Sequence, residues 1–254
     1  METQRPGGAT KAWDCSWISA GQTDVGSSRK INEDAFLDRP EAGMWVVADG
    51  MGGHEAGDVA SAMICERLAS SPVVENLNSA ADLFEETIIA VNTELLRLSH
   101  AEHDGGTVGS TVVGLVTRGQ QGICLWAGDS RAYLMRAGRV ARLTVDHSQV
   151  EQMVADGLIR AEDAETHPAG NVITRAVGGQ PDLMLDRLVC ELQPDDRIVL
   201  CSDGLYKDLD QPTMTQILGE VSPARACELL VEEVLRRGAN DNVTVVIVDF
   251  YEQS

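Results

Sequence analysis

The sequence predicts an α+β fold in which antiparallel sheets are covered by helices. Short runs of β-branched and apolar residues have the composition of buried strands, and longer segments carry an apolar stripe at helical spacing. The predicted strands cluster in the middle and at the end of the chain. They lack the strict strand–helix alternation of a doubly wound parallel sheet, so antiparallel sheets are favoured.

Five segments have the short, β-branched character of buried strands. They are residues 44–48, 111–116, 123–127, 197–201 and 242–250. Several of these runs end directly in aspartate and glycine, which marks the place where a buried strand meets a turn.

Apolar stripes predict a helix over about residues 80–99 and another around residues 60–68. A third helix is expected from about 223 to 237, with Ser222 as its N-cap and Gly238 just past its end.

A further helical stretch, residues 147–156, precedes a polar segment that contains proline. We call residues 146–172 the flap and expect it to lie on the surface of the domain. No linker or low-complexity tract divides the chain after residue 13, so residues 13–254 are predicted to form one domain. Residues 1–12 have no apolar periodicity and are predicted to be a disordered tail.

The composition excludes several classes of partner. Forty acidic and twenty basic residues among 254 give a net charge of -20, which repels nucleic acid and anionic lipid. No apolar run approaches the ~20 residues of a membrane helix, and no signal segment follows Met1. We therefore expect a cytoplasmic protein, monomeric, with no nucleic-acid or membrane partner.

Aspartate and glycine recur at predicted strand ends. Asp49-Gly50 and Asp203-Gly204 each end an apolar run, and Gly128-Asp129 ends a third. Each alone is more typical of an ordinary turn. The repetition favours a cluster of carboxylates, to which Asn32-Glu33-Asp34 and Asp241, just before the last strand, add further acids.

Converging carboxylates repel one another unless cations lie between them. Oxygen ligands select hard ions, so Mg²⁺ or Mn²⁺ is indicated, whereas zinc or copper would require His or Cys at ligand spacing. Gly50 would also let a backbone carbonyl approach an ion closely.

The motifs together resemble those of the metal-dependent protein serine/threonine phosphatases of type 2C, the PPM family. The resemblance covers nearly everything after the tail. It is carried by residues 23–26, Arg29, 32–35, 49–54, 57–58, 109–111, 128–131, 174–178, 202–205 and 241–244. It implies a four-layer α-β-β-α sandwich of two antiparallel sheets flanked by helices.

The resemblance also implies a reaction, the hydrolysis of phosphoserine and phosphothreonine in proteins by a metal-activated water. Two ions lower the pKa of a shared water and stabilise in-line attack at phosphorus. The implied ligands are Asp34, Asp49, the Gly50 carbonyl, Asp203 and Asp241, with Glu33 behind them. Asp129 and Asp203 correspond to the ligands of a third, weaker ion.

Arg29 matches the position at which this family places a guanidinium that grips the substrate phosphate. Lys30 beside it is expected to be a solvated charge.

Two departures from the family pattern affect the site. Met51 stands where eukaryotic relatives carry a histidine, so we assign no general acid and expect His54 to be structural. Lys207 stands where some relatives carry another acidic ligand of the third ion, although Asp208 could partly compensate. His147 and His167, in the flap, are expected to be ordinary surface residues.

Other classes of protein fit less well. No cysteine precedes an arginine by five residues, histidines lack paired Asp-x-His spacing, and the glycines near Gly50 do not form a nucleotide-binding motif. A pseudophosphatase that binds phosphoproteins is the main alternative, but such a protein would be expected to lose a metal ligand. The compact length resembles bacterial members that oppose a Ser/Thr kinase, and residues 125–131 are similar to phosphatases of type VI secretion clusters.

Overall fold

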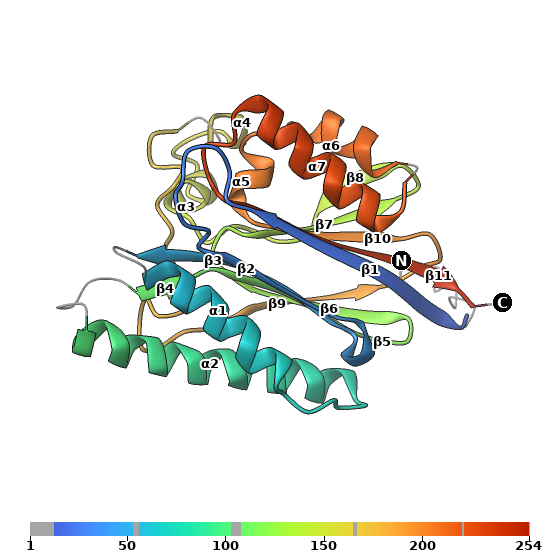
Figure 1. The fold of residues 1–254 in the computed structure, drawn as a ribbon, viewed down its shortest axis with the longest axis horizontal. Coiled ribbons are helices and arrows are strands. Elements are labelled where there is room, and N and C mark those ends of the chain that lie inside the picture. The colour runs from blue at the N-terminus through green and yellow to red at the C-terminus, as the bar shows by residue number, and fades with distance from the viewer. Residues whose placement is uncertain (1–12, 53–55, 103–107, 165–166, 220, 254) are drawn as a thin grey trace, which may run out of the picture.

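The computed structural model describes residues 13–52, 56–102, 108–164, 167–219 and 221–253. Two antiparallel sheets pack face to face, and helices cover both outer faces (Figure 1). The predicted α+β sandwich is therefore confirmed. The predicted disordered tail, residues 1–12, lies outside the described residues.

The first sheet brings the two ends of the described chain together. Its strands are ordered β1 (Cys15–Asp24), β11 (Val243–Glu252), β10 (Arg197–Cys201), β7 (Arg131–Arg136) and β8 (Arg139–Arg142). Strand β1 pairs with β11 along its entire length, from Cys15 opposite Glu252 to Asp24 opposite Val243.

The second sheet contains the other strands. They are ordered β2 (Asp34–Arg39), β3 (Met44–Gly52), β5 (Val112–Arg118), β6 (Gln121–Ala127) and β9 (Asp186–Glu191), with β4 (Val108–Ser110) paired to β3. A short 3-10 helix, Pro40–Ala42, links β2 to β3.

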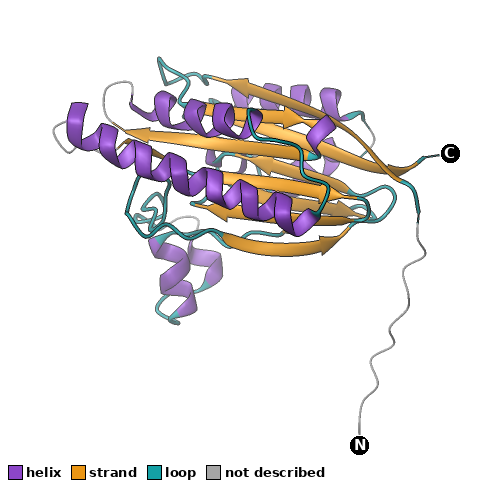
Figure 2. Cartoon of the chain, turned by 90° about the horizontal axis from the view of Figure 1, so that it is seen from below, coloured by secondary structure: helices purple, strands orange, loops and turns teal. Residues whose placement is uncertain are grey.

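Helices α1 (Ala56–Ala69) and α2 (Leu77–Glu102) cover the second sheet. Helices α5 (Asp203–Tyr206), α6 (Gln211–Leu218) and α7 (Pro223–Arg237) cover the first. The flap contains α3 (Gln149–Ala155) and α4 (Ala161–Ala164), which project from one side of the sandwich in Figure 2.

The core has three layers, because each sheet is buried on both faces. Between the sheets, Trp45 and Val47 of β3 pack against residues such as Phe250 of β11. Val46 and Ala48, the alternate residues of β3, face α1 and α2 instead. This alternation follows from the two-residue period of a strand.

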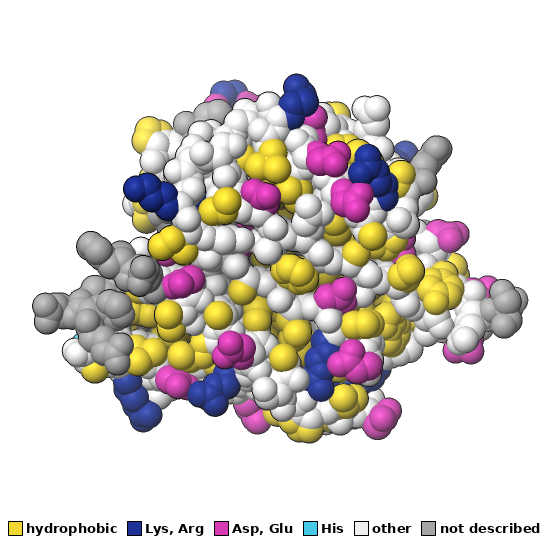
Figure 3. Space-filling view, viewed as in Figure 1, with side chains coloured by type: hydrophobic (Ala, Val, Ile, Leu, Met, Phe, Trp, Pro, Cys, Tyr) yellow, Lys and Arg dark blue, Asp and Glu magenta, His cyan; other side chains and the backbone are white. Residues whose placement is uncertain are grey.

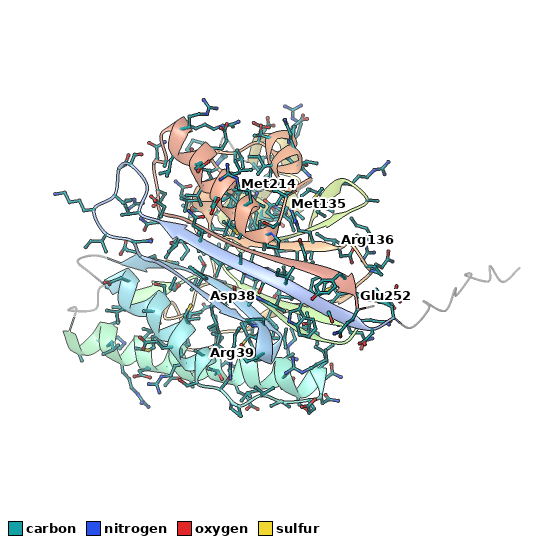
Figure 4. The ribbon with its side chains drawn as sticks, turned by 45° about the vertical axis from the view of Figure 1, so that its right-hand side comes forward. Asp38, Arg39, Met135, Arg136, Met214 and Glu252 are labelled. Atoms are coloured by element: carbon teal, nitrogen blue, oxygen red, sulfur yellow. The ribbon has the colours of Figure 1, made fainter. Side chains whose placement is uncertain are left out.

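On the opposite side, Met214 of α6 is fully buried and Met135 of β7 packs against the same cluster (Figure 4). The N-cap prediction for α7 is confirmed, since Ser222 Oγ accepts a hydrogen bond from the Arg225 N–H at 3.4 Å. Gly238 ends the helix with a φ of 118°, the left-handed conformation that favours glycine.

The sequence predicts the central strands but not β1, β2, β4, β7, β8 or β9. These strands mix polar and apolar residues. In β9 the side chains alternate between exposed and partly buried, and Val189 is 62% exposed. Pairing with a neighbouring strand, rather than a continuous apolar run, determines these elements.

Charged side chains of both signs are scattered over the face drawn in Figure 3, with apolar atoms between them. Among the described helices, none is both long enough and apolar enough to cross a membrane.

Candidate active site

The polar end of the layer between the two sheets forms the candidate active site. In the central strands, alternate residues point into this layer, and most of them are apolar. Where the strands reach one end of the sandwich, the same alternation places polar residues in the layer. They are Asp34, Asp49, Thr111, Ser202 and Thr244.

Asp34 and Asp49 lie directly opposite each other on β2 and β3. Asp34 is only 8% exposed, and its Oδ2 accepts a hydrogen bond from Ser202 Oγ at 2.7 Å. Ser202 Oγ also accepts one from the Thr244 N–H at 3.0 Å. Ser202 therefore connects the first sheet to a carboxylate of the second.

The backbone of Asp49 is held by Ser110, the last residue of β4, and by Thr111, which links β4 to β5. Thr111 donates its N–H to the Asp49 carbonyl at 2.8 Å and accepts the Asp49 N–H on Oγ1 at 3.1 Å. Ser110 Oγ donates to the same carbonyl at 3.0 Å. With its own backbone groups satisfied, Asp49 directs its carboxylate into the site from a rigid strand.

Three further carboxylates come from turns and a helix start. Asp129 lies in the turn between β6 and β7, Asp203 is the first residue of α5, and Asp241 lies two residues before β11. Together with Asp49, these acids line a cleft of about 490 Å³. Asp34 lies behind them, so the structure brings every predicted metal ligand to one place.

The carboxylates act on one another's ionisation. Burial raises the pKa of Asp49 well above its ordinary value, and the charges of the other four carboxylates, Asp34, Asp203, Asp129 and Asp241, raise it further. Burial, with help from Asp203, also raises the pKa of both Asp34 and Asp129 to about 7. Such a concentration of negative charge is stabilised by bound cations.

The donor set fits a hard divalent cation. All of the side-chain donors are carboxylates, and Asp129 Oδ1 is buried without a hydrogen-bond partner in the described part of the chain. A Cβ on Gly50 would lie 2.1 Å from the Gly57 carbonyl oxygen, so only glycine fits where β3 enters the cleft. No three described His, Cys, Asp or Glu side chains close around a single point in their present conformations.

Asp241 and Asp203 each contact a basic side chain of the protein. Arg29 Nη2 donates to Asp241 Oδ2 at 2.8 Å. The hydrogen bond to Asp241 is the largest of the effects that raise the pKa of Arg29. The Lys207 ammonium contacts Asp203 Oδ2 and donates to Asn171 Oδ1 at 2.7 Å. Asp208 instead accepts the Asn240 N–H at 3.3 Å.

Asn242 holds the loop that carries Arg29. Its Nδ2 donates to the Val25 carbonyl at 2.9 Å and to the Ile31 carbonyl at 3.0 Å, and its Oδ1 accepts the Glu33 N–H at 2.8 Å. The Glu33 carbonyl in turn accepts the Gly50 N–H at 3.0 Å. Glu33 thus supports the site through its backbone, and burial raises the pKa of its carboxyl.

The sequence assigns no role to Ser202, Thr111 or Asn242, although each belongs to a motif that carries the family resemblance. A signal was present for Ser202 and Thr111. They follow or precede inward-facing apolar residues by two positions, which places them on the inner face of the sheet.

The prediction that His147 is an ordinary surface residue is wrong. Its side chain is 10% exposed and stacks on Trp126 at 6.1 Å between ring centroids. The Gly128 N–H donates to His147 Nδ1 at 3.1 Å. Burial, with the nearby Arg175, lowers the pKa of His147, so it is a packing residue that supports the turn before Asp129.

Other predicted residues have mixed outcomes. Met51 lines the cleft. His167, predicted to be an ordinary surface residue, is partly buried and lines a second cavity under the flap. Lys30 is exposed, as expected. His54 lies outside the described residues.

Comparison with known proteins identifies the family. A family model described as protein phosphatase 2C matches residues 25–236. A serine/threonine phosphatase of Listeria monocytogenes is 35% identical over 237 residues, covering 90% of this chain and 94% of the relative.

Solved structures agree in fold and sequence. PppA of Pseudomonas aeruginosa, described as a key regulatory component of T6SS, superposes with a TM-score of 0.86 at 40% identity, over 93% of this chain and 98% of that one. The catalytic domain of the phosphatase PstP, described in complex with 2 manganese ions, superposes with a TM-score of 0.82 at 31% identity, over 94% of this chain and 100% of that one. The chain therefore belongs to the protein phosphatase 2C family, and it is a protein serine/threonine phosphatase of the bacterial PPM type.

Proposed function

We propose that this phosphatase hydrolyses phosphoserine and phosphothreonine at a binuclear Mn²⁺ or Mg²⁺ centre held by Asp34, Asp49, Asp203, Asp241 and the Gly50 carbonyl. The observation that supports this most strongly is the convergence of these carboxylates on Asp49, whose pKa burial and all four neighbouring acids raise. The manganese-bound relative supports the choice of metal.

When bound, such ions lower the pKa of a water and neutralise charge that develops on the phosphoryl group. The chain's own residues would hold and position these ions. Asp49, which has the other four acids around it, would be the main ligand, and Ser202 fixes the carboxylate of Asp34 behind it. Asp203 and Asp241 extend from the edge of the cleft, each able to exchange its present cationic partner for an ion.

Arg29 is the proposed phosphate ligand. Its side chain is about half exposed and lines the cleft, and among the described residues Asp241 alone bonds it, through one nitrogen. Exposed ion pairs contribute little to stability, so the guanidinium can turn from Asp241 to a substrate phosphate at small cost. The planar fork of N–H donors then matches two phosphate oxygens.

A pseudophosphatase with the same fold is the second candidate. It is disfavoured, because all five predicted ligand aspartates are present and lie together. One assay distinguishes the two candidates.

The assay is the hydrolysis of a phosphothreonine peptide by the purified protein with Mn²⁺, with EDTA, and after the substitution Asp49→Asn. The proposal expects activity that depends on Mn²⁺ and is lost with EDTA and in the variant. Activity that survives both treatments would exclude the metal mechanism. A protein that binds the peptide without hydrolysing it under any metal condition would be a pseudophosphatase.

In the cell, we propose a cytoplasmic monomer that opposes a Ser/Thr kinase in bacterial signalling. The similarity to PppA supports a role in type VI secretion as the specific pathway. Phosphoproteomics after gene deletion tests this, with raised phosphorylation of secretion-system proteins expected. An unchanged phosphoserine and phosphothreonine profile would contradict it.

A further inference from the structure

The Lys207 side chain lies between the acidic cleft and the flap. Its ammonium contacts Asp203 Oδ2 on one side and donates to Asn171 Oδ1 at 2.7 Å on the other. Lys207 and Asn171 both line the cleft, and both also line the neighbouring cavity of about 630 Å³ under the flap. Lys207 therefore occupies the boundary between the two cavities.

The backbone fixes this placement. Lys207 ends α5 one turn after Asp203, and its N–H donates to the Asp203 carbonyl at 3.0 Å. An i,i+4 pair on a helix lies on one face, so the ammonium reaches the Asp203 carboxylate without leaving the cleft. The side chain is 34% exposed, so much of its stem is packed.

The surroundings of Lys207 are those of a bound cation. Its ammonium contacts Asp203, and Asp129 lines the same cleft with its Oδ1 buried and without a hydrogen-bond partner among the described residues. Lys207 thus supplies a positive charge to the part of the cleft that Asp203 and Asp129 line.

We propose that the Lys207 ammonium takes the place of a third divalent ion that Asp203 and Asp129 would otherwise hold, and that it joins Asp203 to Asn171 of the flap. The inference rests on the proposed binuclear centre. Its consequence is that the loaded protein holds two ions and that its activity needs no third ion of low affinity. A second consequence is that the flap is tied to the metal centre by a side chain.

The test is the number of Mn²⁺ ions bound by the full chain, measured by equilibrium dialysis with elemental analysis up to millimolar Mn²⁺. The wild type is expected to bind two ions per chain. Lys207→Asp replaces the ammonium by a third carboxylate beside Asp203 and Asp129, and is expected to bind three. Lys30→Asp makes the same change of charge at an exposed lysine and is expected to stay at two.

The dependence of activity on Mn²⁺ gives an independent readout. The wild type is expected to saturate in one phase, and Lys207→Asp to show a second phase at higher Mn²⁺. Lys207→Arg keeps a positive charge and should behave as the wild type. A wild type that binds three ions, or a Lys207→Asp variant that stays at two, would overturn the inference. A wild type that binds no ion would overturn the proposed function instead.

Discussion

The inner and outer carboxylates of the cleft differ in how their charge is balanced. Asp34, Asp49 and Asp129 form no ion pair with any described lysine, arginine or histidine, and burial raises the pKa of each. Asp203 and Asp241 at the edge contact Lys207 and Arg29. We propose that Asp34 and Asp49 take their balancing cations from solution, whereas Asp203 and Asp241 have basic side-chain partners that can be exchanged or kept.

The largest effect is expected at Asp49, one of the inner carboxylates. Asp49→Asn should reduce kcat by about 10³-fold or more, because it removes the charge around which the ions assemble. The metal-free variant should also melt at a higher temperature than the wild type, since repulsion among the buried acids is relieved. Kinetics and calorimetry check both expectations.

The matched control is Asp182→Asn, which removes one negative charge from an exposed residue. It should leave kcat and the melting temperature close to the wild-type values. A metal-free Asp49→Asn protein that is less stable than the wild type would contradict the expectation that charge repulsion among the buried carboxylates destabilises the metal-free protein.

The next effect concerns the residue that orients Asp34. Ser202→Ala removes the hydroxyl that bonds both Asp34 and the Thr244 N–H, and should weaken Mn²⁺ binding by about 10- to 100-fold. Titration calorimetry measures the change. Ser222→Ala removes a hydroxyl from the N-cap of α7 and should cost about 1 kcal/mol of stability with Mn²⁺ affinity unchanged. Equal loss of metal affinity in both variants would show that Ser202 acts only on stability.

At the outer edge, Arg29→Lys keeps the charge but loses the fork of donors. We expect KM for a phosphothreonine peptide to rise about tenfold, the effect of losing one charge-assisted hydrogen bond, with Mn²⁺ affinity unchanged. Lys30→Ala should leave KM unchanged. An Arg29→Lys enzyme with normal KM would assign Arg29 to the ion pair with Asp241 alone.

A further expectation concerns the stability of the metal-free protein as a function of pH. The pKa of Asp34 and Asp129 rises from 3.8 to about 7 on folding, so the folded state binds more protons than the unfolded chain between these values. Stability should therefore fall as the pH rises from about 4 to about 7. Thermal melts at several pH values check the slope.

Asp129→Asn should flatten this slope, and Asp182→Asn should not. Saturating Mn²⁺ should restore stability most strongly above pH 7, where the acids are ionised. A wild type whose metal-free stability rises over the same range would contradict the raised pKa values.

The sequence predicts the central strands because their apolar runs are buried on both faces. It predicts Asp49, Asp129 and Asp203 because they follow those runs, whereas the roles of Asp34 and Asp241, which stand at or just before strand starts, are implied by the family resemblance. It does not predict β1 or β9, whose mixed composition becomes regular only through pairing. Nor does it predict that Lys207 contacts Asn171, since the two come together only when the flap folds against α5.

His147 illustrates the same limit. A histidine in a polar segment resembles a surface residue, and only the neighbouring strand β6 brings Trp126 against it. Local pattern therefore identifies the acids of the cleft, whereas their supporting contacts depend on which strands become neighbours.

The central claim is that the cleft carboxylates hold the catalytic cations. A crystal structure of the protein grown with Mn²⁺, phased with anomalous differences at the manganese edge, tests it most directly. Two anomalous peaks are predicted in the cleft, contacting Asp49 and its neighbours, with the Lys207 ammonium still beside Asp203. A protein that is active in solution assays with Mn²⁺, but whose crystals show no manganese at Asp49, would contradict this claim.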